Sequence, residues 1–190
     1  MVTKYAEKVK IYNHYTNYKG RLFVKTLCDL FNDAAEVQTE LYKVDVDTLN
    51  AQGFTWMLHR LHILLHKMPL KEEIVTIETW PSGIDRLFAL RDYRMFREDG
   101  EELVRATSEW MYIDMKRRRP LRLPENVMQN KAKSRIGAIP RYGYAVPKTG
   151  KILRMFAWRG ENRYLCTLIR KFFKRIYVRN SRNRRQTVQG

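Results

Sequence analysis

The sequence predicts an α+β fold in which one long helix packs against an antiparallel sheet. Three observations predict it: one long segment with helical periodicity, four apolar segments that follow it, and short turns between those segments. Strands joined by such short turns pair in antiparallel, and the apolar face of the resulting sheet needs a helix to cover it.

The first two elements are a strand and the long helix. Residues 5–13 alternate loosely between apolar and polar side chains, which indicates a strand. After Gly20, apolar residues recur at steps of three and four: Phe23, Leu27, Leu30, Phe31, Ala34, Ala35, Val37, Leu41 and Tyr42. This spacing predicts a helix of about 20 residues with one apolar face.

Four further strands are predicted, at residues 54–66, 74–80, 86–97 and 103–115. Pro81, Ser82 and Gly83 are typical of a turn after the second of these segments. Asp99 and Gly100 favour a hairpin turn after the third, because both residues tolerate a positive φ. The basic, proline-bounded stretch 117–124 leads out of the last strand.

Charge divides the 190 residues into two parts. Residues 1–130 hold 20 basic and 19 acidic side chains, whereas residues 131–190 hold 17 basic side chains and one acidic side chain. The formal net charge of +17 therefore belongs almost entirely to the second part. We predict a nearly neutral globular domain over 1–130 and a strongly basic tail over 131–190.

Composition also bounds the class of protein and its location. The two cysteines, Cys28 and Cys166, do not form a disulfide framework, and the first residues have no apolar signal segment. No run approaches the 18 apolar residues of a membrane span. A cytoplasmic location is expected from these observations.

Four short motifs resemble a known family. They are 79–83 (TWPSG), 89–93 (ALRDY), 105–110 (RATSEW) and 118–124 (RRPLRLP), and the helical segment 17–40 adds to them. Together they resemble the N-terminal half of acyl-acyl-carrier-protein thioesterases, over about residues 5–127. The resemblance implies a hotdog fold, in which an antiparallel sheet wraps around one long helix, and it assigns residues 1–130 to the first of two hotdog halves.

The resemblance also implies an activity. Members of that family hydrolyse the thioester between a fatty acyl chain and acyl carrier protein, for which they need no metal or redox cofactor. Their second half carries an Asn-His pair in an N-G-H-V-N-N-like string. No such string follows Val127, and residues 131–190 contain no histidine. We therefore expect thioesterase function in fatty acid biosynthesis for the family, and expect this chain to lack the catalytic half.

Two explanations stay open for residues 131–190. The segment is either a frame-shifted or truncated remnant, or the chain is an acyl-binding relative that has lost the chemistry. Residues 164–178 place apolar side chains at helical spacing, with basic side chains on the other face. This pattern predicts an amphipathic helix suited to an anionic membrane surface. The alternative function is therefore a non-catalytic acyl- or membrane-binding module; no specific nucleic-acid partner is expected.

Asn13, His14 and Asn17 are the candidate catalytic residues that the sequence offers. They come just before the long helix, whose first backbone N–H groups are free to hold an oxyanion, and histidine is a usual general base. The competing interpretation is an ordinary strand-to-helix turn with Asn17 near the helix start.

Apolar and aromatic residues at the start of the sheet are candidates for an acyl-binding slot. They are Phe54, Trp56, Met57, Leu58 and Trp80, with Trp110 on a neighbouring strand. The competing interpretation is an ordinary core, because a hotdog pocket would be carved from the core between helix and sheet. A single hotdog would also leave apolar sheet uncovered, so self-association is expected.

Basic residues near the strand ends are candidates for contact with acidic acyl carrier protein. They are Arg86, Arg91, Lys116 and Arg117. Complementary charge would mainly raise the rate of encounter. The competing interpretation is a solvated surface, since Asp85, Asp92 and Glu98 lie nearby in the sequence.

Three histidines fall in one predicted strand, which invites a metal interpretation. His62 and His66 would share a face but lie about 13 Å apart, and His59 would point to the other face. Zinc ligands lie about 2 Å from the ion, so this spacing predicts no metal site.

Overall fold

The computed structural model describes residues 4–125, 127, 151–156 and 177–179. Its elements, in chain order, are β1 (Tyr5–Lys10), the 3₁₀ turn η1 (Asn13–Tyr15), α1 (Val24–Leu41), α2 (Val46–Ala51), β2 (Phe54–Leu65), β3 (Ile74–Asp85), β4 (Phe88–Arg97), β5 (Glu102–Asp114), β6 (Arg119–Leu121), β7 (Lys151–Phe156) and β8 (Tyr177–Arg179).

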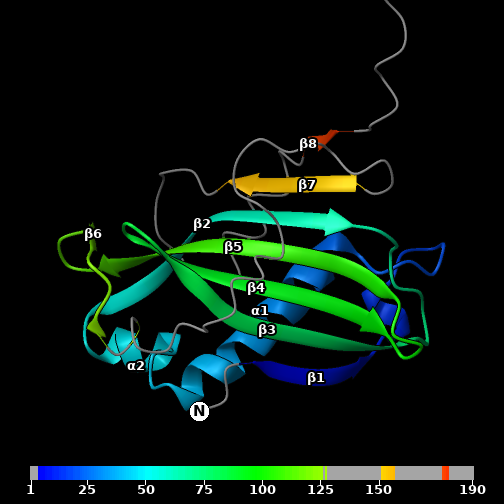
Figure 1. Cartoon of the computed structure of the whole chain (residues 1–190), viewed down its shortest axis with the longest axis horizontal. Coiled ribbons are helices and arrows are strands. Elements are labelled where there is room, and N and C mark those ends of the chain that lie inside the picture. Colours follow the sequence, from blue (N-terminus) through cyan, green and yellow to red (C-terminus); the bar gives the residue numbers. More distant parts are fainter. Residues whose placement is uncertain (1–3, 126, 128–150, 157–176, 180–190) are drawn as a thin grey trace, which may run out of the picture.

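The described strands form one antiparallel sheet. Its order is β1-β3-β4-β5-β2-β7-β8, and β6 pairs with β5. The long helix α1 crosses one face of the sheet, and α2 follows at the end where the β3–β4 turn lies (Figure 1). The predicted α+β class, one long helix against an antiparallel sheet, is confirmed.

The core lies between α1 and the sheet. Leu27, Phe31 and Ala34 of α1 are buried and face buried side chains of the strands, among them Ile63, Ile77, Met95 and Val104. The Phe31 ring stacks on Tyr93 of β4, with ring centroids 4.9 Å apart. The periodicity of α1 thus gives the helix an apolar face, and the two-residue alternation of the strands gives the sheet a matching one.

The predicted turn at residues 81–83 is wrong. Strand β3 continues to Asp85, and its pairing with β4 shifts register between Pro81 and Gly83, as in a β-bulge. A bulge accommodates Pro81, which has no N–H for the ladder, and Gly83, whose φ is +153°. The chain reverses instead at Arg86 and Leu87, where Arg86 has a φ of +54°.

The short helix α2 was not predicted. Its N-cap is Asp45, whose carboxylate accepts a hydrogen bond from the Thr48 N–H at 2.8 Å. Burial alone would raise the pKa of Asp45, but this bond and neighbouring backbone N–H groups lower it. Because Trp56 Nε1–H donates to the Val44 carbonyl at 2.8 Å, the segment leading into α2 is held against the start of β2.

The basic tail contributes two strands to the sheet. β7 pairs with residues 60–65 of β2, and β8 pairs with β7. The predicted amphipathic helix lies outside the described residues at 164–176 and is wrong at Tyr177 and Val178, which belong to β8. No helix in the described ranges is both long enough and apolar enough to cross a membrane.

Pairing with β7 bears on the expected self-association. β2 pairs with β5 along one edge, and β7 pairs with residues 60–65 along its other edge. A strand of a second molecule would otherwise be able to pair with β2 at this edge. Self-association stays a prediction. A mass in solution twice that of the 22.9 kDa chain would support it, and a monomer at high concentration would count against it.

Candidate functional site

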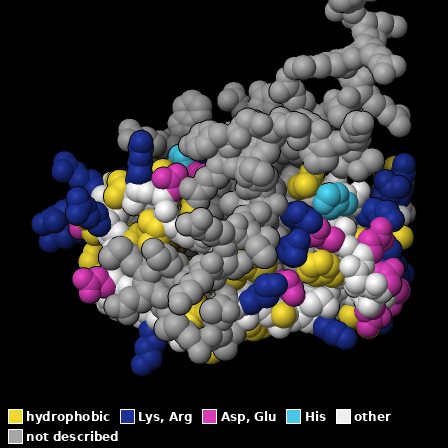
Figure 2. Space-filling view, in the orientation of Figure 1, with side chains coloured by type: hydrophobic (Ala, Val, Ile, Leu, Met, Phe, Trp, Pro, Cys, Tyr) yellow, Lys and Arg dark blue, Asp and Glu magenta, His cyan; other side chains and the backbone are white. Residues whose placement is uncertain are grey.

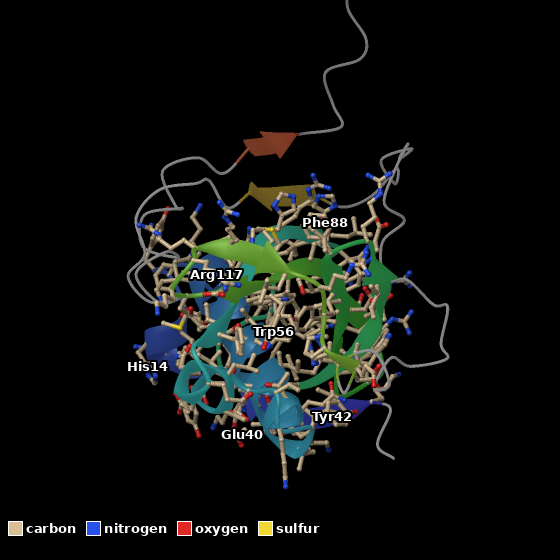
Figure 3. All side chains as sticks on the ribbon, turned by 90° about the vertical axis from the view of Figure 1, so that its left-hand side faces the viewer. His14, Glu40, Tyr42, Trp56, Phe88 and Arg117 are labelled. Atoms are coloured by element: carbon tan, nitrogen blue, oxygen red, sulfur yellow. The ribbon has the colours of Figure 1, made fainter. Side chains whose placement is uncertain are left out.

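A cavity opens between α1, the start of α2 and one end of the sheet. It has an empty volume of about 680 Å³, a figure that includes space open to solvent. Its walls are formed by Asn32, Ala35, Glu36, Thr39, Tyr42, Val44, Val46, Trp56, Pro81, Ala89, Leu90, Arg91, Trp110 and Val127. Figure 3 looks at this end of the molecule and shows Trp56 between the sheet and the helices.

The strands supply the apolar and aromatic part of the wall. Trp56 faces the helices because side chains alternate along β2, and its hydrogen bond to the Val44 carbonyl fixes the indole. Ala89 of β4 lies opposite Trp110 of β5, so a small side chain is paired with a large one. Tyr112 of β5 lies opposite Trp56, and their ring centroids are 5.6 Å apart. This wall is suited to an alkyl chain.

The helix α1 supplies a polar strip. Asn32, Glu36 and Thr39 are three or four residues apart and therefore share one face. Glu36 is half-buried, and its Oε1 accepts a hydrogen bond from the Val46 N–H at 3.2 Å. Burial raises the pKa of Glu36, nearby acidic residues raise it further, and the Val46 N–H partly offsets both effects. The cavity is thus polar along the helix and apolar along the sheet.

Arg91 of β4 also faces the helix. Its side chain is buried, with an exposure of 8%, and Nη1 donates to Gln38 Oε1 at 2.6 Å and to Thr79 Oγ1 at 3.1 Å. Burial lowers the pKa of this guanidinium. The expected place of Arg91 on the carrier-protein surface is wrong. Side chains alternate along β4, and Arg91 is buried on the face that α1 covers.

The five residues expected to form the acyl slot occupy different places. Trp56 lines the cavity, Phe54 packs next to it against Tyr112, and Leu58 packs on the main core. Met57 alternates with Trp56 and so points to the other face of the sheet, opposite Met111.

Trp80 likewise points away from the cavity. It alternates with Thr79, whose hydroxyl meets Arg91, and the Lys4 Nζ lies 4.8 Å from the centroid of its ring. Met57 and Trp80 are therefore not part of the cavity wall.

The cavity residues of α1 and β4 were not predicted. Strand alternation could have revealed Arg91, since it shares a face with Tyr93 and Met95, which are both buried. Glu36 carried no such signal, because a carboxylate beside an apolar stripe is ordinary for a surface helix. Only the packing of α2 and β2 around it makes Glu36 part of a cavity.

Asn13, His14 and Asn17 lie away from this cavity. Asn13 and His14 are exposed on η1, and the His14 ring packs between the rings of Tyr12 and Tyr15, at 5.9 and 4.3 Å. His14 lies apart from Trp56 and Tyr42 in Figure 3.

Asn17 closes the turn before α1. Its Oδ1 accepts hydrogen bonds from the Lys19 and Arg21 N–H groups, at 2.9 and 3.2 Å. These contacts are those of a structural turn. The expected place of Asn17 near the helix N-cap is wrong, because α1 begins at Val24 and Phe23 is its N-cap.

The histidines of β2 have ordinary surroundings. His59 stacks on Phe88 with ring centroids 4.7 Å apart, and burial lowers the pKa of His59. Within the described ranges, no three His, Cys, Asp or Glu side chains are grouped closely enough to hold a metal ion.

Arg86, Lys116 and Arg117 gather at the cavity end of the sheet. Phe88, the first residue of β4, lies opposite Met111, so the β3–β4 turn with Arg86 and the β5–β6 turn with Lys116 and Arg117 share that end. All three are exposed. Figure 2 shows Lys and Arg side chains gathered there, at the left of the view. We call these three residues the basic end.

The comparisons with known proteins define the class. A model of the acyl-ACP thioesterase N-terminal domain matches residues 2–130. The chain therefore belongs to the acyl-ACP thioesterase family, through its N-terminal domain. Oleoyl-acyl carrier protein thioesterase 2 of Arabidopsis thaliana is 27% identical over 130 residues, which cover 65% of this chain and 35% of that protein. The chain thus spans about a third of the length of this curated relative.

Solved structures confirm the hotdog thioesterase fold. An acyl-ACP thioesterase from Bacteroides thetaiotaomicron superposes with a TM-score of 0.68 and 24% identity, covering 75% of this chain and 58% of that one. The 12:0-ACP thioesterase of Umbellularia californica superposes with a TM-score of 0.65 and 14% identity, covering 74% and 57%. At these identities the likeness shows the fold alone.

Proposed function

We propose that this chain binds the fatty acyl chain of an acyl-acyl-carrier-protein in the cavity, and that hydrolysis of the thioester needs a second hotdog half. The cavity wall of Trp56, Trp110 and Ala89 supports the first part, because it offers a continuous apolar surface open to solvent. The sequence supports the second part, since the Asn-His string of the family is absent after Val127.

The place of the basic end supports acyl carrier protein as the partner. Arg86, Lys116 and Arg117 are exposed at the end of the sheet where the cavity lies. Arg117 is only loosely paired, with its Nε 3.9 Å from an Asp114 carboxylate oxygen. A basic surface beside an apolar cavity would attract an acidic carrier protein while its acyl chain enters the protein.

Acyl-carrier-protein binding is the test of this proposal. We expect acylated carrier protein to bind at least tenfold more tightly than the unacylated form, because two buried methylenes already give about 1.6 kcal/mol. We expect no hydrolysis at a rate typical of the family. Titration calorimetry measures the binding, and equal binding of both carrier forms would refute the acyl-binding role of the cavity. Release of free thiol measures hydrolysis, and rapid cleavage would refute the need for a second half.

Charge reversal separates the basic end from the cavity. We expect the double change Lys116→Glu and Arg117→Glu to slow association with the carrier protein about tenfold at low salt, with little effect at high salt. Lys19→Glu with Lys71→Glu is the matched control, because both lysines are exposed and Lys71 lies before β3, at the opposite end of the sheet. If the double variant associates as fast as the control, the basic end does not attract the carrier protein.

A further inference from the structure

Arg91 is a buried cation whose charge is not neutralised by an ion pair. Its exposure is 8%, and both acceptors of its Nη1 donors, Gln38 and Thr79, are neutral. None of the ion pairs in the described part of the chain involves it. A buried charge is costly unless an opposite charge or a full set of hydrogen bonds compensates it.

The guanidinium also has donors to spare beside the cavity. Of its five N–H groups, the two on Nη1 reach Gln38 and Thr79, and those on Nε and Nη2 donate to no other described residue. Arg91 is itself part of the cavity wall. The side chain that carries the remaining donors therefore borders a space that a ligand can enter.

Glu36 is the one other charged side chain among the described residues of the cavity wall. Glu36 is the carboxylate whose charge acts on Arg91, but Glu36 is more exposed than Arg91 and its Oε1 is bound to the Val46 N–H. Tyr42 is the other titratable side chain of the cavity wall. The rest of the surroundings, led by Trp56, Trp110 and Ala89, is apolar or aromatic. The arrangement is a single buried cation at the wall of a largely apolar cavity.

We propose that the cavity binds a free fatty acid, with the carboxylate on the guanidinium of Arg91 and the alkyl chain along Trp56 and Trp110. Guanidinium and carboxylate match in geometry and form strong charge-assisted hydrogen bonds. In an acyl thioester the carboxyl carbon is bonded to the carrier, so only the methyl end can enter. The free acid mode is therefore distinct from the proposed function, and the two ligands would compete for one cavity.

The competing explanation is that Arg91 only joins α1 to the sheet through Gln38 and Thr79. A purely structural arginine would not distinguish an acid from a neutral molecule of the same length. The preference for one head group over another is therefore the informative measurement, and overall affinity is not.

Binding of dodecanoic acid and of 1-dodecanol to the full chain, both below the concentration at which they aggregate, tests the proposal by titration calorimetry at pH 7.5. We expect the wild-type chain to prefer the acid at least tenfold. Arg91→Met should bring the ratio of the two affinities close to one while leaving dodecanol binding within threefold. Arg21→Met, at an exposed arginine that precedes α1 and does not line the cavity, is the matched control and should keep the preference.

Two further measurements keep the test decisive. Glu36→Gln removes the negative charge near the proposed carboxylate, and we expect it to strengthen acid binding two- to fivefold and to leave dodecanol unchanged. Methyl dodecanoate against the wild-type chain needs no variant, and we expect it to bind as weakly as dodecanol. Equal wild-type binding of acid, alcohol and ester would overturn the proposal.

The proposed function has a separate readout. Tight binding of the alcohol and ester without any preference for the acid would leave the apolar cavity in place and remove only the role of Arg91. Absence of all three alkyl ligands from the cavity would count against both proposals.

Discussion

Replacing Phe31 by alanine is expected to lower the free energy of unfolding by about 3–5 kcal/mol, the largest effect on stability that we predict for one side chain. Phe31 is 2% exposed and contacts the core from the middle of α1. The change removes the burial of a whole ring, opens a cavity between helix and sheet, and abolishes the stacking on Tyr93 at 4.9 Å. Denaturant unfolding followed by tryptophan fluorescence measures the loss.

Val37→Ala is the control for this prediction. Val37 is on the same helix but is exposed, so its loss should change the free energy of unfolding by less than about 0.5 kcal/mol. Because a loss of 5 kcal/mol can exceed the stability of a domain of this size, Phe31→Leu offers a milder variant, expected to cost about 1–1.5 kcal/mol. Equal effects for Phe31 and Val37 would contradict the burial of Phe31.

Replacing Ala89 by phenylalanine is expected to weaken binding of a long acyl chain at least fifteenfold. Ala89 lines the cavity opposite Trp110, so a ring at this position occupies space that the chain needs. Exclusion of two methylenes costs about 1.6 kcal/mol of binding free energy, which corresponds to about fifteenfold. The measurement is a series of acyl-carrier-protein ligands of increasing chain length, titrated into the wild-type chain and the variant.

The chain-length profile shows whether the cavity itself is blocked. A ring in the cavity should penalise long chains and spare short ones, whereas a folding defect would weaken all lengths alike. Leu87→Phe is the control, because Leu87 lies exposed in the β3–β4 turn, two residues from Ala89. A variant at Ala89 with an unchanged profile would mean that the acyl chain binds elsewhere.

Local periodicity made the main elements predictable. The three- and four-residue spacing of Leu27, Leu30, Phe31 and Ala34 predicted α1, and these residues are buried in it. The bulge at Pro81–Gly83 escaped prediction because proline and glycine also mark turns, and only pairing with β4 distinguishes the two. The N-cap signal of Asp45 was present, but α2 is six residues long and has too little periodicity to be noticed.

Motifs in the sequence determined the family, and charge showed where the neutral domain gives way to the basic tail. The family assignment was suggested by short strings such as 89–93 and 105–110, and these lie within residues 2–130, which the family model matches. The tertiary structure alone decided which side chains share the cavity. Glu36, Val46, Trp56 and Arg91 are far apart in the chain, and they meet because α1 and α2 fold onto one end of the sheet. Sequence periodicity specifies which face of each element is apolar, but only packing specifies which faces enclose a space.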